Sequence, residues 1–187
     1  METTPETPEE KRDRFRATVT DWWKEMQPAA EQAGEPSRRG ERAELKRCKT
    51  LAELFLVPRF QVLRWRLARA GFDHESRRPA IAAAAGILAR VEHTTDLKFP
   101  AWLAQFKANG EPRVSELRFR RLVSCGPLED LFPALLRVIP LAEDTAPVAS
   151  LAYDIYHWGE KTRQRWTMEY YEALLVQEEK SGRAAKG

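Results

Sequence analysis

Apolar side chains recur at helical spacing along this chain, and this periodicity constrains its fold more than any other feature. Phe15, Val19 and Trp22 lie three or four residues apart, and Trp166 and Tyr170 repeat that spacing near the other end. Such spacing places apolar groups on one face of a helix. No window combines strict alternation with enrichment in β-branched residues. The sequence therefore predicts an all-α fold.

The chain has 187 residues, enough for one core or for two small helical lobes that share one. We expect a single compact helical bundle. The predicted domain spans residues 11–178. A disordered acidic leader over residues 1–10 is expected before it, and a frayed tail over residues 179–187 after it.

Local signals mark where individual helices begin. Thr50 and Glu53 match a capping box, and Pro58 must kink or restart the helix that follows. The segment AAEQAGEPSRRG is rich in Ala, Gly, Pro and Ser and is expected to be a loop. Within GPLEDLFPALLRVIP the helix start stays open between Pro127 and Pro133.

Sequence motifs of common enzymes are missing from the chain. It has no GxxxxGK[ST], GxGxxG, HExxH or GxSxG segment, so we expect no enzymatic activity and no cofactor. Cys48 and Cys125 stand far apart and are expected to be small packed side chains. The three histidines are also scattered, and no metal site is expected.

No apolar run reaches the roughly 20 residues that a membrane helix needs. The first residues are acidic and lack an apolar signal core. We therefore expect a cytoplasmic protein that does not associate with a membrane.

Positive charge is concentrated in the middle of the chain, although the net charge is only +3. Residues 35–69 hold ten Lys and Arg against four Asp and Glu, and residues 77–125 hold nine against four. Such an asymmetry can form a positive face that attracts a polyanion. The six tryptophans could in principle stack on bases. Trp22, Trp65, Trp102 and Trp166, however, lie on apolar stripes, which favours core or subunit-interface packing.

Two basic segments are the strongest candidates for a binding surface. Arg42, Lys46 and Arg47 project from adjoining parts of one helical surface, although a solvated basic face would give the same pattern. With RVSELRFRRLVSC taken as one helix, a helical projection places Arg118 inside the apolar arc and Arg121 on its rim; the arc consists of Val114, Leu117, Leu122 and Cys125. Either Arg118 pairs with a buried acid, or its helix faces a nucleic acid or a partner; the residues leave both open.

Four segments resemble the CasB family, the small subunit of the type I-E CRISPR interference complex called Cascade. They are GERAELKRC (40–48), VPRFQVLRW (57–65), VSELRFRRLV (114–123) and YHWGEKTRQRW (156–166), in the family's order and at similar spacing. The resemblance covers most of the chain between Phe15 and Leu175. It implies an all-helical protein with two small lobes and no catalytic activity.

The resemblance also implies partners and a role. The family's small subunit lies as two copies beside the backbone subunits that hold the guide RNA and beside the large subunit. It stabilises the R-loop, in which the guide RNA pairs with target DNA and the non-target strand is displaced. Sequence-independent phosphate contacts suit this role because any target must be accepted.

By resemblance, a role in binding nucleic acid extends to nine cations of this chain. The stronger candidates are Arg42, Lys46, Arg47, Arg118 and Arg121; the weaker ones are Arg38, Arg77, Arg78 and Arg120.

Two alternatives accompany this hypothesis. The chain could be a helical scaffold whose basic faces contact only acidic proteins. It could also be a helix-turn-helix regulator with SCGPLED as its turn, but the helix that follows has one arginine, too few to read a major groove.

Overall fold

The computed structural model describes residues 6–34 and 36–184, which form eleven α-helices and one 3₁₀ turn. Within those ranges there is no strand, only two isolated β-bridges, so the all-α prediction is confirmed. The elements are α1 (Pro8–Lys24), α2 (Pro28–Gln32), α3 (Arg39–Arg47), α4 (Leu51–Phe55), α5 (Pro58–Arg69), η1 (Glu75–Arg77), α6 (Arg78–Leu88), α7 (Phe99–Leu103), α8 (Glu116–Val123), α9 (Leu128–Leu141), α10 (Val148–Tyr156) and α11 (Glu160–Ala184).

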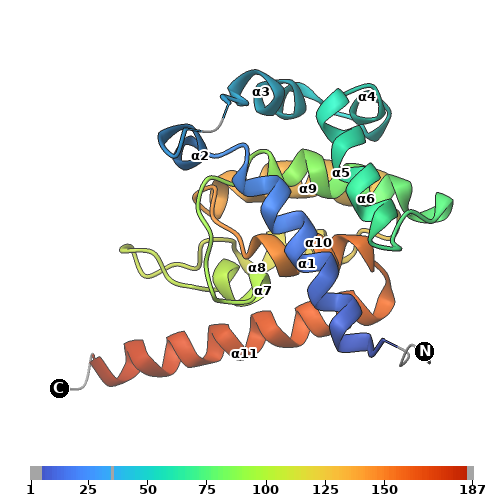
Figure 1. The fold of residues 1–187 in the computed structure, drawn as a ribbon. Helices are drawn as coiled ribbons and strands as arrows, with labels where there is room; N and C mark the ends of the chain where they lie inside the picture. Colours follow the sequence, from blue (N-terminus) through green and yellow to red (C-terminus); the bar gives the residue numbers. More distant parts are fainter. Residues whose placement is uncertain (1–5, 35, 185–187) are drawn as a thin grey trace.

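The helices form two sets that share one core (Figure 1). In the first set, α1, α3, α4, α5, α6 and α10 pack mainly against one another. In the second, α8 packs on α9 and α11, and α11 also packs on α7. The contact of α9 with α6 joins the sets, and the buried hydrophobic residues form one cluster from Phe15 to Tyr170. This is the arrangement expected of two small lobes with a common core.

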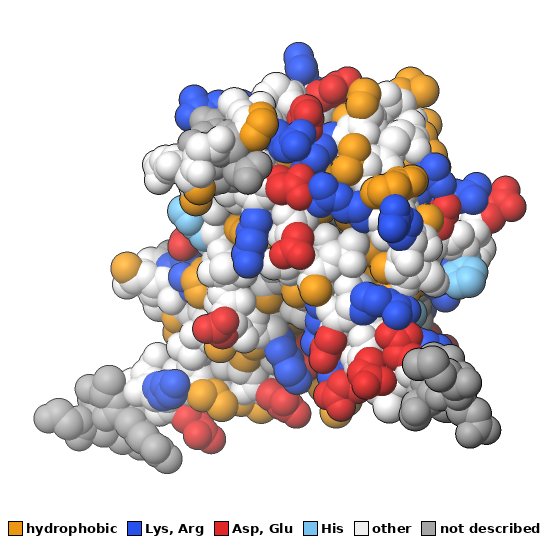
Figure 2. Space-filling model, viewed as in Figure 1, with side chains coloured by type: hydrophobic (Ala, Val, Ile, Leu, Met, Phe, Trp, Pro, Cys, Tyr) orange, Lys and Arg blue, Asp and Glu red, His pale blue; other side chains and the backbone are white. Residues whose placement is uncertain are grey.

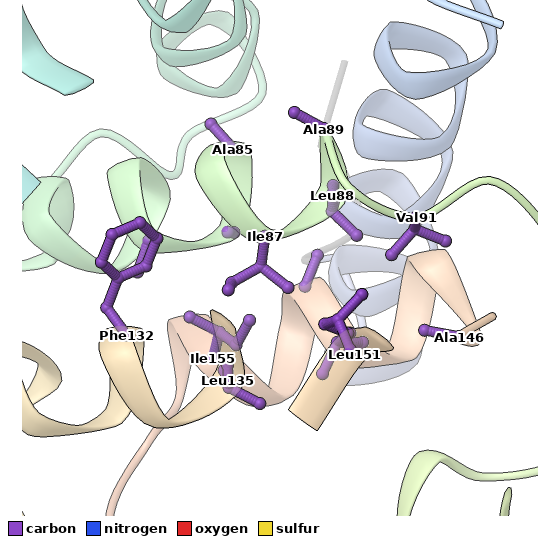
Figure 3. Close-up of a cluster of buried hydrophobic side chains, with 14 of the residues drawn as sticks. Ala85, Ile87, Leu88, Ala89, Val91, Phe132, Leu135, Ala146, Leu151 and Ile155 are labelled. Atoms are coloured by element: carbon purple, nitrogen blue, oxygen red, sulfur yellow. The ribbon is translucent and has the colours of Figure 1, made fainter. Parts of the chain in front are cut away.

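Small residues on α6 let other helices approach its axis closely. Residues 80–88 are all buried, and α4, α9 and α10 pack around them. Figure 3 shows Phe132 of α9 and Ile155 of α10 next to the segment that holds Ile87. A Cβ atom at Gly86 would lie only 2.8 Å from the Phe132 ring, so the missing side chain allows this close approach.

The first helix begins earlier, and the last helix ends later, than the expected domain limits. The hydroxyl of Thr7 accepts a hydrogen bond from the amide of Glu10 (3.2 Å), and the Glu10 carboxylate accepts one from the amide of Thr7 (2.7 Å). This capping box starts α1 at Pro8, while α11 continues to Ala184. The other parts of the expected leader and tail, residues 1–5 and 185–187, lie outside the described residues.

Other local predictions have mixed outcomes. The Thr50 hydroxyl accepts a hydrogen bond from the Glu53 amide (3.3 Å) and caps α4 as predicted. The helix α9 begins directly after Pro127 and continues through Pro133, which decides the open choice of its start. The segment predicted as a loop after the first helix contains the short helix α2. Pro28 supplies the fixed φ angle that suits the first position of a helix.

The tryptophans were predicted to pack in the core or at a subunit interface, and Trp65 is not in the core of this chain. Trp22 and Trp166 are fully buried and Trp102 is half-buried, but Trp65 on α5 is 55% exposed. The guanidinium of Arg69 lies 4.9 Å from the centre of the Trp65 ring. An apolar stripe on a helix does not reveal whether another helix covers its far end.

Candidate nucleic-acid interface

The predicted site residues lie on two separate parts of the fold. Helix α3 packs against α5 and α6, whereas α8 packs against α9 and α11. The two basic segments therefore belong to different sets of helices. Figure 2 shows Lys and Arg interspersed with Asp and Glu on the face in view. A continuous basic surface does not cover that face.

Arg42 has a structural role that the sequence pattern did not reveal. Its Nε donates to the carbonyl oxygen of Ala89 (2.8 Å), and its Nη2 donates to that of Val91 (3.1 Å). These carbonyls follow the last turn of α6, where helical hydrogen bonding runs out and a cation is favourable. Only 13% of the Arg42 side chain is exposed. Its guanidinium therefore stabilises the junction of α3 and α6.

Arg90, which follows α6, binds carbonyl oxygens at the end of α3. From the end of α6, its guanidinium donates to the carbonyl oxygens of Lys46 and Cys48, the latter at 2.9 Å. These carbonyls lie at the end of α3. Burial lowers the pKa of Arg90. The ends of α3 and α6 are thus each capped by an arginine from the other segment.

Lys46 and Arg47, near the end of α3, are accessible. The Lys46 ammonium lies 3.3 Å from the Glu92 carboxylate, with 41% of its side chain exposed. Arg47 is exposed, and its Nε donates to the carbonyl of Ala43 one turn earlier (3.3 Å). Within the described residues, Arg47 makes no ion pair with a carboxylate. Of Arg42, Lys46 and Arg47, Arg47 is therefore the most available to a phosphate.

This difference predicts opposite effects for two arginines of one helix. Arg42→Gln should lower the free energy of unfolding by about 1.5–3 kcal/mol, because charge-assisted hydrogen bonds to buried carbonyls are lost. Arg47→Gln should change it by less than about 0.5 kcal/mol. Urea denaturation followed by circular dichroism measures both. Equal stability of the two variants would contradict the capping role of Arg42.

The weaker candidates are also engaged within the fold. The Arg38 guanidinium lies 3.2 Å from Glu41, and Arg77 donates to the carbonyl of Tyr156 (3.0 Å). Arg78 pairs with Asp73 at 2.9 Å, a hydrogen bond that raises the pKa of Arg78. Arg77 thereby connects η1 to α10, whereas the ion pairs of Arg38 with Glu41 and of Arg78 with Asp73 are local. The nucleic-acid role inferred from the family resemblance stays a prediction for them.

Helix α8 resolves the position of Arg118, and the projected apolar arc is wrong. The helix begins at Glu116, so Val114 lies before it, where its amide donates to the carbonyl of Leu103 (3.0 Å). The buried residues of α8 are Phe119 and Leu122, whereas Leu117 is 60% exposed. Arg118 therefore lies beside the buried strip and is itself exposed.

Phe119 anchors α8 to α11. Its ring stacks on the Tyr170 ring with a centroid separation of 3.9 Å and an interplanar angle of 7°. The Tyr170 hydroxyl donates to the carbonyl of Val114 (2.7 Å), and burial raises the pKa of Tyr170 to about 12. On the outer side of α8, Arg120 is 69% exposed and lies 3.7 Å from Glu116. The anchoring turns Arg118 and Arg121 towards α9.

A groove of about 460 Å³ lies between α8 and α9. Its lining consists of Arg118, Arg121, Leu122, Cys125, Ala134, Arg137, Val138 and Leu141. We call it the α8–α9 groove. Three arginines stand around an apolar floor, and none of the residues that line the groove is acidic.

The three groove arginines are available for a ligand. In the described part of the chain, Arg118, Arg121 and Arg137 make no ion pair with a carboxylate, and Arg121 and Arg137 are exposed like Arg118. Three guanidiniums without a paired acid create a positive potential in a low-dielectric hollow. This is the strongest candidate anion site of the described residues.

Arg137 is the groove residue that sequence reasoning missed. It is the single charged residue in the apolar run LFPALLRVIP, which was a signal in itself. The same helix buries Phe132, Leu135 and Ile139 against the core. This burial also counts against the helix-turn-helix alternative, because a recognition helix must offer its surface to DNA.

The turn between α8 and α9 is fixed by one hydrogen bond from a distant residue and by one local hydrogen bond. Trp158 Nε1 donates to the carbonyl oxygen of Cys125 (3.0 Å). The Cys125 thiol lies 3.4 Å from the carbonyl oxygen of Arg121, to which it donates. Burial raises the pKa of Cys125, so the neutral thiol adds no negative charge to the groove near pH 7. Cys48 and Cys125 are both free.

No three His, Cys, Asp or Glu side chains of the described residues are grouped so that they could hold a metal ion. In the same ranges, no helix is both long and apolar enough to cross a bilayer.

Comparisons with known proteins agree with the fold. A family model described as CRISPR-associated protein Cse2 matches residues 41–171. A chain in the crystal structure of E. coli Cascade bound to a PAM-containing dsDNA target is similar, with a TM-score of 0.64 and 19% sequence identity. The match covers 84% of this chain and 97% of that chain. At this identity it shows a shared fold. No curated protein matches the chain.

Proposed function

The chain belongs to the Cse2 (CasB) family of CRISPR-associated proteins, and from this premise we propose that it is a non-catalytic subunit of a type I-E Cascade complex. In this role it binds nucleic acid without sequence specificity and stabilises the R-loop. Its proposed partners are the backbone subunits, the large subunit, a second copy of itself, the guide RNA and both DNA strands. The fold shared with a chain of the DNA-bound E. coli complex supports this proposal.

The α8–α9 groove is the observation that carries the nucleic-acid part of the proposal. Arg118 and Arg121 were predicted from the sequence, and the fold adds Arg137 beside them. Arginine contacts phosphate through a planar fork of donors, without reading bases. Lys46 and Arg47 are proposed as a second phosphate contact on α3. Arg42 holds α3 to α6, and its role in binding nucleic acid stays a prediction.

A modest affinity is sufficient for this role. R-loop formation exchanges a DNA duplex for an RNA–DNA duplex of similar stability. Binding that favours the displaced strand tenfold contributes about 1.4 kcal/mol, roughly the stacking free energy of one average base-pair step. A few phosphate contacts can therefore shift the balance towards the open state.

The test neutralises the groove in the purified protein. The triple variant Arg118→Gln, Arg121→Gln, Arg137→Gln should bind fluorescent single-stranded DNA more weakly than the unchanged protein. The slope of log affinity against log salt concentration should fall in magnitude by about 2, because each lost phosphate contact removes roughly 0.7. Fluorescence anisotropy over a salt series measures both quantities.

A control variant that loses the same number of positive charges distinguishes the effect of the groove arginines from the effect of a lower net charge. Lys11→Gln, Arg12→Gln and Lys180→Gln remove three cations from the start of α1 and the end of α11. The salt slope should then change by less than 1. Equal slopes for the two triple variants would contradict the groove as the site. If the unchanged protein binds no DNA at any salt concentration, the scaffold alternative gains support.

A further inference from the structure

We infer that the α8–α9 groove holds an unpaired nucleobase of single-stranded DNA on its apolar floor, while its three arginines contact the flanking phosphates. This inference rests on the proposed function and adds how the strand is bound. Contact with a nucleobase would make the groove bind unpaired DNA more tightly than paired DNA.

The floor of the groove is the first reason. Leu122, Ala134 and Val138 form it, and 1%, 8% and 5% of their respective surfaces are exposed. Cys125 and Leu141 extend it. A surface that bound only phosphates would need cations, but it would not need a hollow with an apolar floor. A nucleobase has a planar apolar face that gains by leaving water.

The arrangement of charge is the second reason. The cations are Arg118 and Arg121 on one wall and Arg137 on the other. Each nucleotide joins a negative phosphate to a flat apolar group, so it complements a cationic rim around an apolar floor. The guanidinium plane of arginine also stacks on bases.

The size and concavity of the groove are the third reason. A hollow of about 460 Å³ lies within the roughly 300–1,000 Å³ typical of small-molecule sites. In a duplex both faces of a base are covered by its neighbours, and only the base edges are accessible. A base can reach the floor only from an unpaired segment.

The first test compares two oligonucleotides with equal numbers of phosphates. One is oligothymidylate, and the other has abasic sites throughout its central part. The unchanged full-length protein should bind the oligothymidylate tighter by roughly fivefold or more, the lower end of what one stacked base contributes. The salt slopes should be the same, because the phosphate contacts are the same.

Cys125 allows the groove to be blocked after folding. It is half-buried in the groove, whereas Cys48 is only 7% exposed and its thiol donates to the Glu44 carbonyl (3.5 Å). A bulky maleimide should therefore label Cys125 first. The labelled protein should lose its preference for oligothymidylate but keep its affinity for the abasic strand. Cys125→Ser protein treated in the same way should keep the preference.

The same thiol reports which partner occupies the groove. Saturating oligothymidylate should slow maleimide labelling of Cys125 at least about threefold, because an occupied floor is closed to the reagent. The abasic strand should slow it less. A peptide of alternating Glu and Leu tests the competing idea of an acidic protein partner. Protection by this peptide and not by DNA would overturn the inference.

The other outcomes separate this inference from the proposed function. Equal affinity for the two oligonucleotides would refute the base contact but leave phosphate binding intact. A preference that survives labelling of Cys125 would place the base contact outside the groove. The absence of binding to either oligonucleotide would reject both proposals.

Discussion

Replacing Arg59 with alanine should lower the free energy of unfolding by about 3–5 kcal/mol, the cost of breaking a buried ion pair. Only 1% of the Arg59 side chain is exposed. Its Nη2 donates to the Glu25 carboxylate (2.8 Å) and to the carbonyl oxygen of Trp22 (2.9 Å). Trp22 Nε1 in turn donates to the carbonyl of Arg59 (3.1 Å). The substitution removes the two hydrogen bonds of the guanidinium and leaves a cavity, whereas the bond from Trp22 Nε1 goes to the main-chain carbonyl of residue 59 and is retained.

Both partners of this ion pair stay charged near neutral pH. Burial lowers the pKa of Arg59, and Glu25 opposes that effect. Burial raises the pKa of Glu25, but hydrogen bonds from Arg66 and Arg59 outweigh it, so this pKa lies below its ordinary value. The contribution of Glu25 to stability is present above its unfolded pKa and is lost as the pH falls through the lower folded pKa.

Arg66→Ala is the matched control. Arg66 lies on the same helix and pairs with the same carboxylate at 2.5 Å, but 31% of its side chain is exposed. Solvent screening should limit the loss to about 1 kcal/mol. Chemical denaturation of both variants gives the comparison. Similar losses for Arg59→Ala and Arg66→Ala would show that the burial of Arg59 does not decide its contribution.

Phe132→Ala should also cost about 3–5 kcal/mol of unfolding free energy. Phe132 is 1% exposed and lies against α6 in the contact that joins the two sets of helices (Figure 3). The main causes are the lost burial of the ring and the cavity that remains. Thermal or urea unfolding, followed by circular dichroism, measures the effect.

A substitution at Gly86 tests how closely α6 approaches the Phe132 ring of α9. A Cβ atom there would meet the Phe132 ring at 2.8 Å and the Leu54 side chain at 2.9 Å. Gly86→Ala should therefore destabilise the protein by overpacking. The loss should be smaller when Phe132 is already alanine, with an interaction free energy between the two substitutions of about 0.5–3 kcal/mol. Gly40→Ala, where no atom lies within 4 Å, should not destabilise. Additive effects of Gly86→Ala and Phe132→Ala would contradict the close contact.

The starts of α4 and α5 could be predicted because their causes are local. Thr50 caps α4 through an amide three residues away, and Pro58 begins α5 after an extended Val57. The capping box of Thr7 and Glu10 carries the same signal, but the acidic composition around it favoured a disordered leader. The helical projection of Arg118 failed at a boundary: it counted Val114 into a helix that begins at Glu116.

The candidate site could be predicted only in part. Arg118 and Arg121 were found as basic residues of one segment, but Arg137 joins them because α9 packs against α8. Arg42 looked like Arg47 in the sequence, yet its donors are used by carbonyls that follow α6. Trp65 was predicted to pack in the core or at a subunit interface, and the fold leaves 55% of it exposed, which excludes the core.

By itself, the sequence determined the all-α class, the starts of α4 and α5 and the family, because helical periodicity, caps and motif order depend on neighbouring residues. Only the tertiary structure decided which arginines are free and which are engaged. Every guanidinium carries the same charge and the same donors. Whether it meets a carbonyl, a carboxylate or solvent depends on segments that folding brings together from far along the chain.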